Sequence, residues 1–420
     1  MTPALRFESN RWLGWWHEGT PEGRRALIAA ALGWMLDAFD VMLYALVLKS
    51  IMTEFGLTTE IAGLLGSATL ISSALGGMIF GVIADRFGRT RALMASVLIY
   101  SIFTAACGFA QSVTQLAVFR VLLGLGFGGE WASGAALVSE TWPPEHRGKA
   151  LGFMQSSWAI GYGLAAIVTM VVLPQWGWRG VFFVGILPAL LTLWIRRYVK
   201  EPRIWLEARG RVSNHTRRAR FADVFHGSML KLTIAVTAMN ACTMFAWWGF
   251  NLWLPGYLSL PSPAGGMGFS SEAMTGLIVA MQVGMWFGYV TFGFISDAIG
   301  RKRAYVAYLL LAAVLIFAFI SVHATLVLLV LGPLAAFFAT GYFSGFGAVT
   351  AEIYPTAIRA TAQGFTYNVG RIASAVAPFA VGSLAQTRGF RAALSLTSVA
   401  FVCAAVAWIA IPETRGRQLE

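Results

Sequence analysis

Hydrophobic residues occur along this chain in runs of about twenty, the length of helix that crosses a bilayer, separated by short polar stretches. The runs lack the alternation of barrel strands and exceed a strand's length, so α-helices are the conformation that satisfies the backbone in lipid. We therefore expect an all-α membrane protein. The pattern predicts twelve transmembrane helices, at 26–51, 60–83, 91–110, 115–138, 150–173, 179–197, 228–251, 273–296, 304–322, 324–348, 361–385 and 390–411.

The chain contains an internal repeat. The string SETWPPEHRG at 139–148 returns as AEIYPTAIRA at 351–360, and GVIADRFGR at 81–89 returns as GFISDAIGR at 293–301. Both strings are displaced by the same distance along the chain, and two unrelated strings that share one displacement indicate a duplicated half. In a chain this apolar, the duplication is typical of transporters built from two similar helical bundles.

Charge and the repeat together predict the domain organisation. About 25 of the 31 lysines and arginines lie in the termini and in every second loop, a distribution that places those segments in the cytoplasm. The net charge of +12 therefore indicates membrane orientation, not nucleic-acid binding. We expect a cytoplasmic segment at 1–25, a six-helix bundle at 26–198, a basic cytoplasmic linker at 199–224, a second six-helix bundle at 225–412 and a cytoplasmic tail at 413–420.

The sequence gives little support for disulfides, metal binding, enzymatic activity or nucleotide binding. The three cysteines lie within apolar runs, and the five histidines have no ligand-like spacing, so neither a disulfide nor a metal site is expected. No nucleophile has an evident base, which argues against an enzyme. The Gly-x-Gly-x-x-Gly pattern at 124–129 lies inside an apolar run without a preceding strand, so it predicts close helix packing and not nucleotide binding. No cofactor is expected.

The repeated loop string carries a gating motif. Gly77 and Gly81 form a Gly-x-x-x-Gly pair that lets helix backbones approach closely, and Asp85 is placed to cap a neighbouring helix. The string resembles the loop signature of the major facilitator superfamily, as do the Glu-x-x-Pro-x-x-x-Arg copies from Glu140 and Glu352 and the run 412–416. The resemblance covers essentially the whole chain and implies two pseudo-symmetric six-helix halves. The gating-motif residues are Gly81, Asp85, Arg86, Gly88, Arg89, Asp297 and Arg301.

Acidic residues inside the predicted spans are candidate proton carriers. Asp37 and Asp40 share one helix face, and a carboxylate buried in a bilayer costs several kcal/mol unless paired or protonated. Their string DAFD resembles the Asp-Gly-Phe-Asp signature of aromatic-acid/proton symporters, with alanine for glycine. Glu130, in GEW, resembles a motif of metabolite/proton symporters, sialic-acid carriers included. Arg120 lies in a string that resembles the family's fourth-span motif. As an alternative to a role in proton coupling, Asp40 and Arg120 could form a fixed ion pair with each other.

Arg371 is the candidate substrate residue. It lies about ten residues into its span, or about 15 Å deep, and Asp37 is about as deep in the first span. A guanidinium at that depth fits a carboxylate ligand, although a structural salt bridge to Asp37 or Glu130 is also possible. Further polar and aromatic residues could line the same cavity. They are Asn368, Tyr367, Gln155, Tyr162, Trp247, Asn251, Gln282 and Tyr342.

These residues predict proton-coupled uptake of a small organic carboxylate by alternating access. The resemblance implies an aromatic acid, sialic acid or a lactate-type monocarboxylate as substrate, with protons and the lipid bilayer as the other partners and one chain as the functional unit. The plasma membrane, that is a bacterial inner membrane, is the expected location. Open alternatives are a sugar/proton symporter or facilitator, a drug/proton antiporter and a membrane sensor that does not transport.

Overall fold

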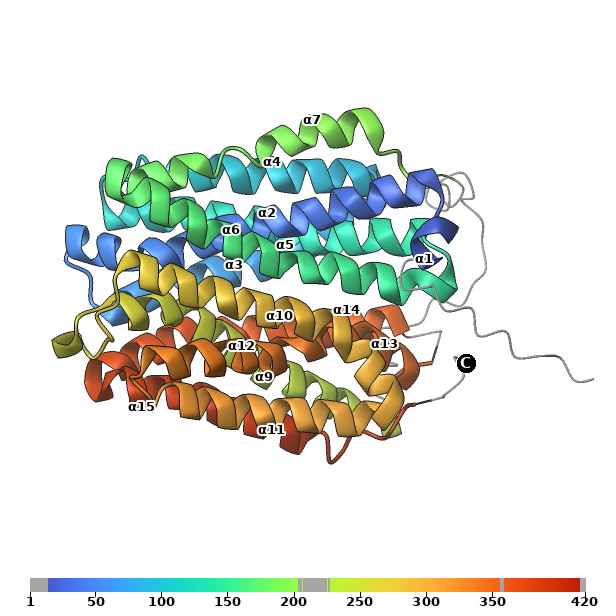
Figure 1. Ribbon diagram of the computed structural model, residues 1–420. Helices are drawn as coiled ribbons and strands as arrows, with labels where there is room; N and C mark the ends of the chain where they lie inside the picture. Colours follow the sequence, from blue (N-terminus) through green and yellow to red (C-terminus); the bar gives the residue numbers. More distant parts are fainter. Residues whose placement is uncertain (1–13, 203–205, 207–224, 226, 356–358, 416–420) are drawn as a thin grey trace, which may run out of the picture.

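The computed structural model describes residues 14–202, 206, 225, 227–355 and 359–415. Its described elements are all helical, and they form two bundles that lie side by side (Figure 1). The N-terminal half comprises α1 Gly14–Glu18, α2 Pro21–Phe55, α3 Thr59–Phe87, α4 Arg89–Cys107, α5 Val113–Thr141, α6 Pro144–Val184 and α7 Ala189–Tyr198. The C-terminal half comprises α9 Ser228–Ser259, α10 Ser271–Ile299, α11 Arg301–Phe319, α12 Thr325–Gly341, η3 Tyr342–Gly345, α13 Phe346–Ile353, α14 Arg359–Ser374 and α15 Ala377–Ala407, with the single turn η2 Ser262–Ala264 between α9 and α10.

The twelve predicted spans are present, although not as twelve separate helices. Ten helical segments of the described chain are long and apolar enough to cross a membrane. Two of them, His146–Tyr198 and Ala362–Ala407, are each bent at a glycine with positive φ, Gly177 (+65°) and Gly389 (+81°), and each makes two crossings. Only glycine adopts this conformation readily, and the two bends occupy equivalent positions of the repeat.

The first span begins earlier than expected. The hydrophobic pattern places its start at residue 26, whereas α2 starts at Pro21. The Thr20 hydroxyl accepts a hydrogen bond from the Gly23 backbone N–H (3.0 Å), and proline occupies the first helical position. This capping arrangement starts a helix irrespective of hydrophobicity, which is why a hydrophobic pattern misses its first turn.

Glycines bring α3 and α5 into direct backbone contact. A Cβ placed on Gly128 would lie 1.8 Å from the Ser73 carbonyl oxygen, and one on Gly76 would lie 2.1 Å from the Leu125 carbonyl oxygen. Gly124, first residue of the Gly-x-Gly-x-x-Gly pattern, is equally close to α3, so that pattern does mark helix packing. The expected Gly77–Gly81 pair is only half right, because a Cβ on Gly81 would meet nothing within 4 Å. The close approach is made by Gly76 and Gly77 instead.

Gly128→Ala is expected to destabilise the protein by about 1–3 kcal/mol, because the added methyl group must displace a helix backbone. Thermal unfolding of the purified protein in detergent measures the effect. Gly276→Ala is the matched control: this exposed helical glycine has open space at its Cβ position, and its substitution should change stability by less than about 0.5 kcal/mol. Equal destabilisation by both substitutions would contradict the packing account.

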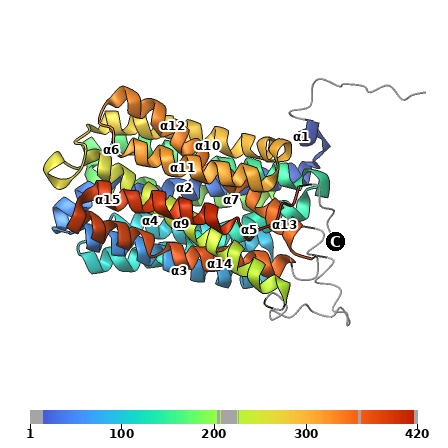
Figure 2. The same cartoon turned by 90° about the horizontal axis from the view of Figure 1, so that it is seen from below.

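The helices of both halves run along one long axis of the molecule (Figures 1 and 2). We call the end with the 88–91 and 300–303 loops the basic end and the other the opposite end. Hydrogen bonds join the halves toward the opposite end: Lys49 Nζ donates to the Ser259 carbonyl and Thr59 Oγ1 to the Gly382 carbonyl (both 2.8 Å). None is found between the described residues of the two halves at the basic end. The hydrogen bonds between the halves are therefore concentrated toward the opposite end, while the ring stack of Trp131 and Tyr367 joins the halves nearer the basic end.

Candidate functional site

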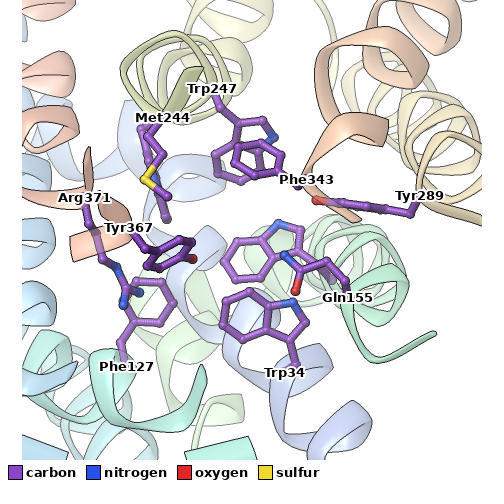
Figure 3. Close-up of a pocket in the computed structure, with 11 residues that line it drawn as sticks. Trp34, Phe127, Gln155, Met244, Trp247, Tyr289, Phe343, Tyr367 and Arg371 are labelled. Atoms are coloured by element: carbon purple, nitrogen blue, oxygen red, sulfur yellow. The ribbon is translucent and has the colours of Figure 1, made fainter. Parts of the chain in front are cut away.

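A pocket of about 450 Å³ lies between the two halves, and most of its lining is aromatic (Figure 3). Helices α2, α5 and α6 contribute from the N-terminal half, and α9, α10, η3 and α14 from the C-terminal half. The lining residues are Trp34, Phe127, Gln155, Trp158, Met244, Trp247, Trp248, Tyr289, Phe343, Tyr367 and Arg371.

Arg371 is the one ionisable side chain of this lining apart from its tyrosines, and it reaches across the interface. It belongs to α14, yet its guanidinium carbon lies 4.8 Å from the ring centre of Phe127 on α5. The side chain is 4% exposed, and among the described residues it makes no ion pair within 4 Å. The alternative of a fixed salt bridge to Asp37 or Glu130 therefore has no direct contact to support it. A buried guanidinium free of such a pair is available to an anionic ligand.

Asp37 and Glu130 nevertheless lie within electrostatic range of Arg371. Asp37 interacts with Glu130, Arg371 and Asp40, and Glu130 interacts with Arg371. Glu130 packs against α2 where Gly33 leaves room, because a Cβ on that glycine would lie 2.5 Å from Glu130 Oε1. Both carboxyl groups are buried, and Asp37 Oδ2 and both oxygens of Glu130 lack a hydrogen-bond donor. Asp37 and Arg371, for which the sequence indicates equal depth, thus interact electrostatically without forming an ion pair.

The alternative ion pair between Asp40 and Arg120 is absent. The Arg120 guanidinium lies over the ring of Tyr44, with its carbon 3.7 Å from the ring centre. Asp40 is beside Thr104, but the Thr104 hydroxyl donates to the Tyr100 carbonyl (2.8 Å). Both carboxylate oxygens of Asp40 therefore lack a hydrogen bond. A cation held by a π face needs no carboxylate partner, so the alternative of an Asp40–Arg120 ion pair has no contact in this structure to support it.

Four of the nine expected substrate residues line the pocket: Gln155, Trp247, Tyr367 and Arg371. Asn251 and Gln282 line a second, smaller pocket inside the C-terminal half. The Tyr162 hydroxyl donates across the interface to the Asn251 carbonyl (3.4 Å), and the Asn368 amide donates to the Gly364 carbonyl (2.9 Å). These four are near the interface or the C-terminal core, but not in the pocket lining.

Tyr342 is displaced from the pocket by the local backbone. Helix α12 ends at Gly341, and the 3-10 turn η3 follows. The tighter turn rotates the following side chains, so that Phe343 lines the pocket while the ring of Tyr342 packs on Tyr305 and Phe401. A helix continued through this segment, as the sequence suggested, would have presented a different face.

Sequence reasoning missed most of the aromatic lining. Trp34, Trp158 and Trp248 lie in apolar runs where an aromatic residue is more often a packing residue. The available signal was their density, because α9 carries Trp247 and Trp248 in succession and both rings pack on Trp158 (5.6 and 6.2 Å between centres). Such a cluster from separate helices is visible only once the bundle is assembled.

The loop motifs form the same charge network in both halves. At the basic end, Arg89 Nη2 lies 2.9 Å from Glu140 Oε1, and its repeat, Arg301 Nη2, lies 3.3 Å from Glu352 Oε1. Asp297 pairs with Arg301 (2.6 Å) and does not cap a helix, and Arg86 is exposed. The Asp85 side chain lies outside the described residues, so its expected capping role stays a prediction.

Two glutamates cap the helices that follow these loops. Glu201 accepts hydrogen bonds from the backbone N–H groups of Thr90 and Arg91 (both 3.2 Å) at the start of α4. Glu413, at the equivalent position of the second half, accepts from the N–H groups of Arg301 (2.8 Å) and Lys302 (3.1 Å) at the start of α11. Gly88 and Gly300 precede these helices with positive φ, and a Cβ on either would collide with the capping carboxylate.

The Glu413 cap predicts a stability difference that depends on pH. Partial burial alone would raise the pKa of this carboxyl, but the backbone N–H groups of Arg415, Arg301, Lys302 and Thr414 hold it below its ordinary value. A lowered folded-state pKa stabilises the fold above the ordinary carboxyl pKa of about 4.3, and the stabilisation disappears as the pH falls through the folded value.

Glu413→Gln is accordingly expected to lower stability at pH 7 by about 1 kcal/mol. The difference from the natural protein should shrink when both are unfolded thermally near pH 4. A difference of the same size at both pH values would show that the carboxylate charge does not stabilise this helix end.

Comparison with known proteins agrees with this architecture. The profile of the Major Facilitator Superfamily matches residues 30–263 and 258–419. The chain is similar to a probable 4-methylmuconolactone transporter of Cupriavidus pinatubonensis (34% identity, 97% of this chain and 94% of the relative). It is also similar to the cis,cis-muconate transport protein of Acinetobacter baylyi (33% identity, 94% and 96%).

Among solved structures, the xylose transporter of E. coli in an inward open conformation has the same fold. The TM-score is 0.76 at 20% identity, over 93% of this chain and 97% of the transporter. The two sequence matches cover nearly the whole length of this chain and of each relative, so neither relative has a further domain outside the match. The chain therefore belongs to the major facilitator superfamily and is a multi-pass membrane transport protein, not an enzyme.

Proposed function

We propose that this transporter carries a small organic carboxylate together with protons. The observation that carries the proposal is Arg371, a buried guanidinium without an ion pair among the described residues, in a pocket between the halves. A guanidinium can bind a carboxylate through two parallel hydrogen bonds, whereas a neutral sugar needs many polar partners, and most of this lining is aromatic. The relatives named for muconate and methylmuconolactone transport support an organic acid as substrate.

The proton sites in this proposal are Asp37 and Glu130. Two buried carboxyl groups share a single arginine, so if both are ionised, one negative charge is left without a partner. A proton taken up by either acid removes that charge and weakens the attraction that holds Arg371 toward the N-terminal half. The arginine is then available to the substrate carboxylate. Substrate and proton thus favour each other's binding, as symport requires.

Asp40 has a secondary role in this scheme. It lies one turn beyond Asp37 and interacts with it electrostatically, so its charge modulates the proton site without contacting Arg371. Arg120, stacked on Tyr44, leaves Asp40 unpaired and keeps this influence in place. We assign proton binding to Asp37 and Glu130, and we propose that Asp40 adjusts it.

Alternating access follows from the two halves. The hydrogen bonds toward the opposite end hold the halves together there, and on the basic side of the pocket the rings of Trp131 and Tyr367 stack across the interface (4.2 Å between centres). The distribution of lysine and arginine supports a cytoplasmic location for the basic end, in a bacterial inner membrane. Rearrangement would break the Lys49 and Thr59 contacts and close the loops with their Arg–Glu pairs.

Counterflow in proteoliposomes tests the substrate class. Vesicles loaded with an unlabelled acid should take up the same acid in labelled form, with benzoate, sialic acid and lactate tested in turn and glucose as the neutral control. The proposal expects counterflow of at least one carboxylate and none of glucose. Counterflow of glucose alone would establish a sugar carrier, and ligand binding without any counterflow would establish a sensor.

A further inference from the structure

The pocket contains a second feature that the carboxylate site does not use, namely a group of indole N–H donors without acceptors. Four buried tryptophans among the described residues have an Nε1 atom with no hydrogen-bond partner, and three of them line this pocket: Trp34, Trp158 and Trp247. Each is no more than 5% exposed. A buried donor without an acceptor is costly, so three in one pocket call for an explanation.

Three indoles outside the pocket have acceptors, whereas the buried Trp408 has none among the described residues. Trp142 donates to the Gly23 carbonyl and Trp253 to the Pro378 carbonyl (both 2.9 Å), and Trp178 donates to Glu54 (2.6 Å). A helix carbonyl can accept a second hydrogen bond only from a side chain that reaches that helix backbone, as Trp253 does, and Trp34, Trp158 and Trp247 make no such contact with the described residues. A ligand in the cavity can supply the missing acceptor.

The three indoles are contiguous. The ring centre of Trp158 lies 4.7 Å from that of Trp34 and 5.6 Å from that of Trp247. Trp34 and Trp158 belong to the N-terminal half and Trp247 to the C-terminal half, so an acceptor bound here contacts both halves. We call Trp34, Trp158 and Trp247 the indole cluster.

The indole cluster and Arg371 are distinct parts of the pocket. In Figure 3, Arg371 and Phe127 lie on one side of the cavity, while Trp34, Gln155 and Tyr289 lie on the other and Trp247 at the top. The walls between them are aromatic faces, which favour a flat unsaturated body. A ligand that satisfies the whole pocket therefore has acceptor groups at two ends of a planar frame.

Resting on the carboxylate transport proposed above, we infer that the indole cluster is a specificity subsite for a second hydrogen-bond acceptor on the substrate. The substrate is then a planar unsaturated acid whose carboxylate binds Arg371 and whose far end carries a carbonyl, lactone or second carboxyl oxygen. Acids that end in an alkyl group leave the three donors unpaired and bind more weakly. Sites built around buried donors reject such analogues strongly.

Two probes of nearly equal shape test the subsite. 4-Acetylbenzoate has a carbonyl oxygen opposite its carboxylate, and 4-isopropylbenzoate has a methyl group in that place. Binding of each to the purified full chain is measured calorimetrically in detergent. The natural protein is expected to prefer the acetyl compound by about tenfold, as one buried hydrogen bond provides.

Trp34→Phe, Trp158→Phe and Trp247→Phe keep an aromatic ring and remove one N–H each, and at least one should reduce the preference to below about threefold. Phe343→Leu is the matched control, because Phe343 lines the same pocket and its side chain has no hydrogen-bond donor. That substitution can weaken both probes, but it should leave their ratio unchanged.

Equal affinity of the natural protein for the two probes overturns the subsite, whatever the variants do, and leaves carboxylate transport standing. If Phe343→Leu changes the ratio as much as the three tryptophan substitutions do, the assignment to the indole cluster is overturned. Failure of both probes to bind also overturns the subsite. Whether carboxylate transport itself fails is decided separately by counterflow with the wider panel of acids.

Discussion

Arg371→Gln is expected to abolish binding of the carboxylate substrate. The variant keeps a polar side chain of similar length but removes the charge in a desolvated pocket, where truncating one partner of a charge pair costs about 2–5 kcal/mol. Affinity should therefore fall about thirtyfold or more. Calorimetric titration of the purified protein with the acid identified by counterflow measures the loss.

Two further variants sharpen this test. Arg371→Lys retains the charge without the planar fork and should bind with intermediate affinity. Arg388→Gln removes an exposed arginine at the opposite end and should bind as the natural protein does. Unchanged affinity in Arg371→Gln would show that Arg371 does not hold the substrate.

Asp37→Asn is expected to uncouple substrate transport from the proton gradient. The amide has nearly the shape of the protonated acid but cannot release a proton, so the variant resembles a permanently loaded proton site. Counterflow should continue at a rate within about tenfold of the natural protein, whereas accumulation driven by a proton gradient should fall to the equilibrium level. Glu130→Gln should act in the same direction if both acids take part.

Glu60→Gln is the control for these acid substitutions. Glu60 is exposed in the first turn of α3 at the opposite end, and it is not among the groups that interact with Asp37 or Glu130. Its loss should leave gradient-driven accumulation intact. Accumulation that persists in both Asp37→Asn and Glu130→Gln would exclude these two acids as the coupling site.

The fold was largely predictable from the sequence, because long apolar runs leave helices as the only conformation for the backbone in lipid. The internal repeat also extends further than the two strings that revealed it. Glu201 and Glu413 cap equivalent helices, and Gly177 and Gly389 bend equivalent ones. Glu413 lies in the run 412–416 that resembles a family signature, but its capping role, like the bends at Gly177 and Gly389, depends on contacts and backbone angles that the sequence does not show.

The site was predictable only where a residue was conspicuous in its surroundings. Asp37, Glu130 and Arg371 are charges inside apolar spans, and the structure brings them together. Arg120 is equally conspicuous, but its partner is the ring of Tyr44, which no charge count could indicate. The tryptophans of the indole cluster resemble ordinary packing residues in the sequence, and only the rotation of α2, α6 and α9 within the bundle turns them toward one cavity.

Proton-driven accumulation tests the central claim most directly. Proteoliposomes containing the natural protein, Asp37→Asn or Arg371→Gln are given the labelled acid with and without an inward proton gradient. Substrate, pH and membrane area are matched among the three, and empty liposomes correct for diffusion of the protonated acid. The account predicts gradient-dependent accumulation above equilibrium in the natural protein alone, with counterflow retained by Asp37→Asn and lost in Arg371→Gln. Accumulation that ignores the gradient, or that survives both substitutions, would contradict it.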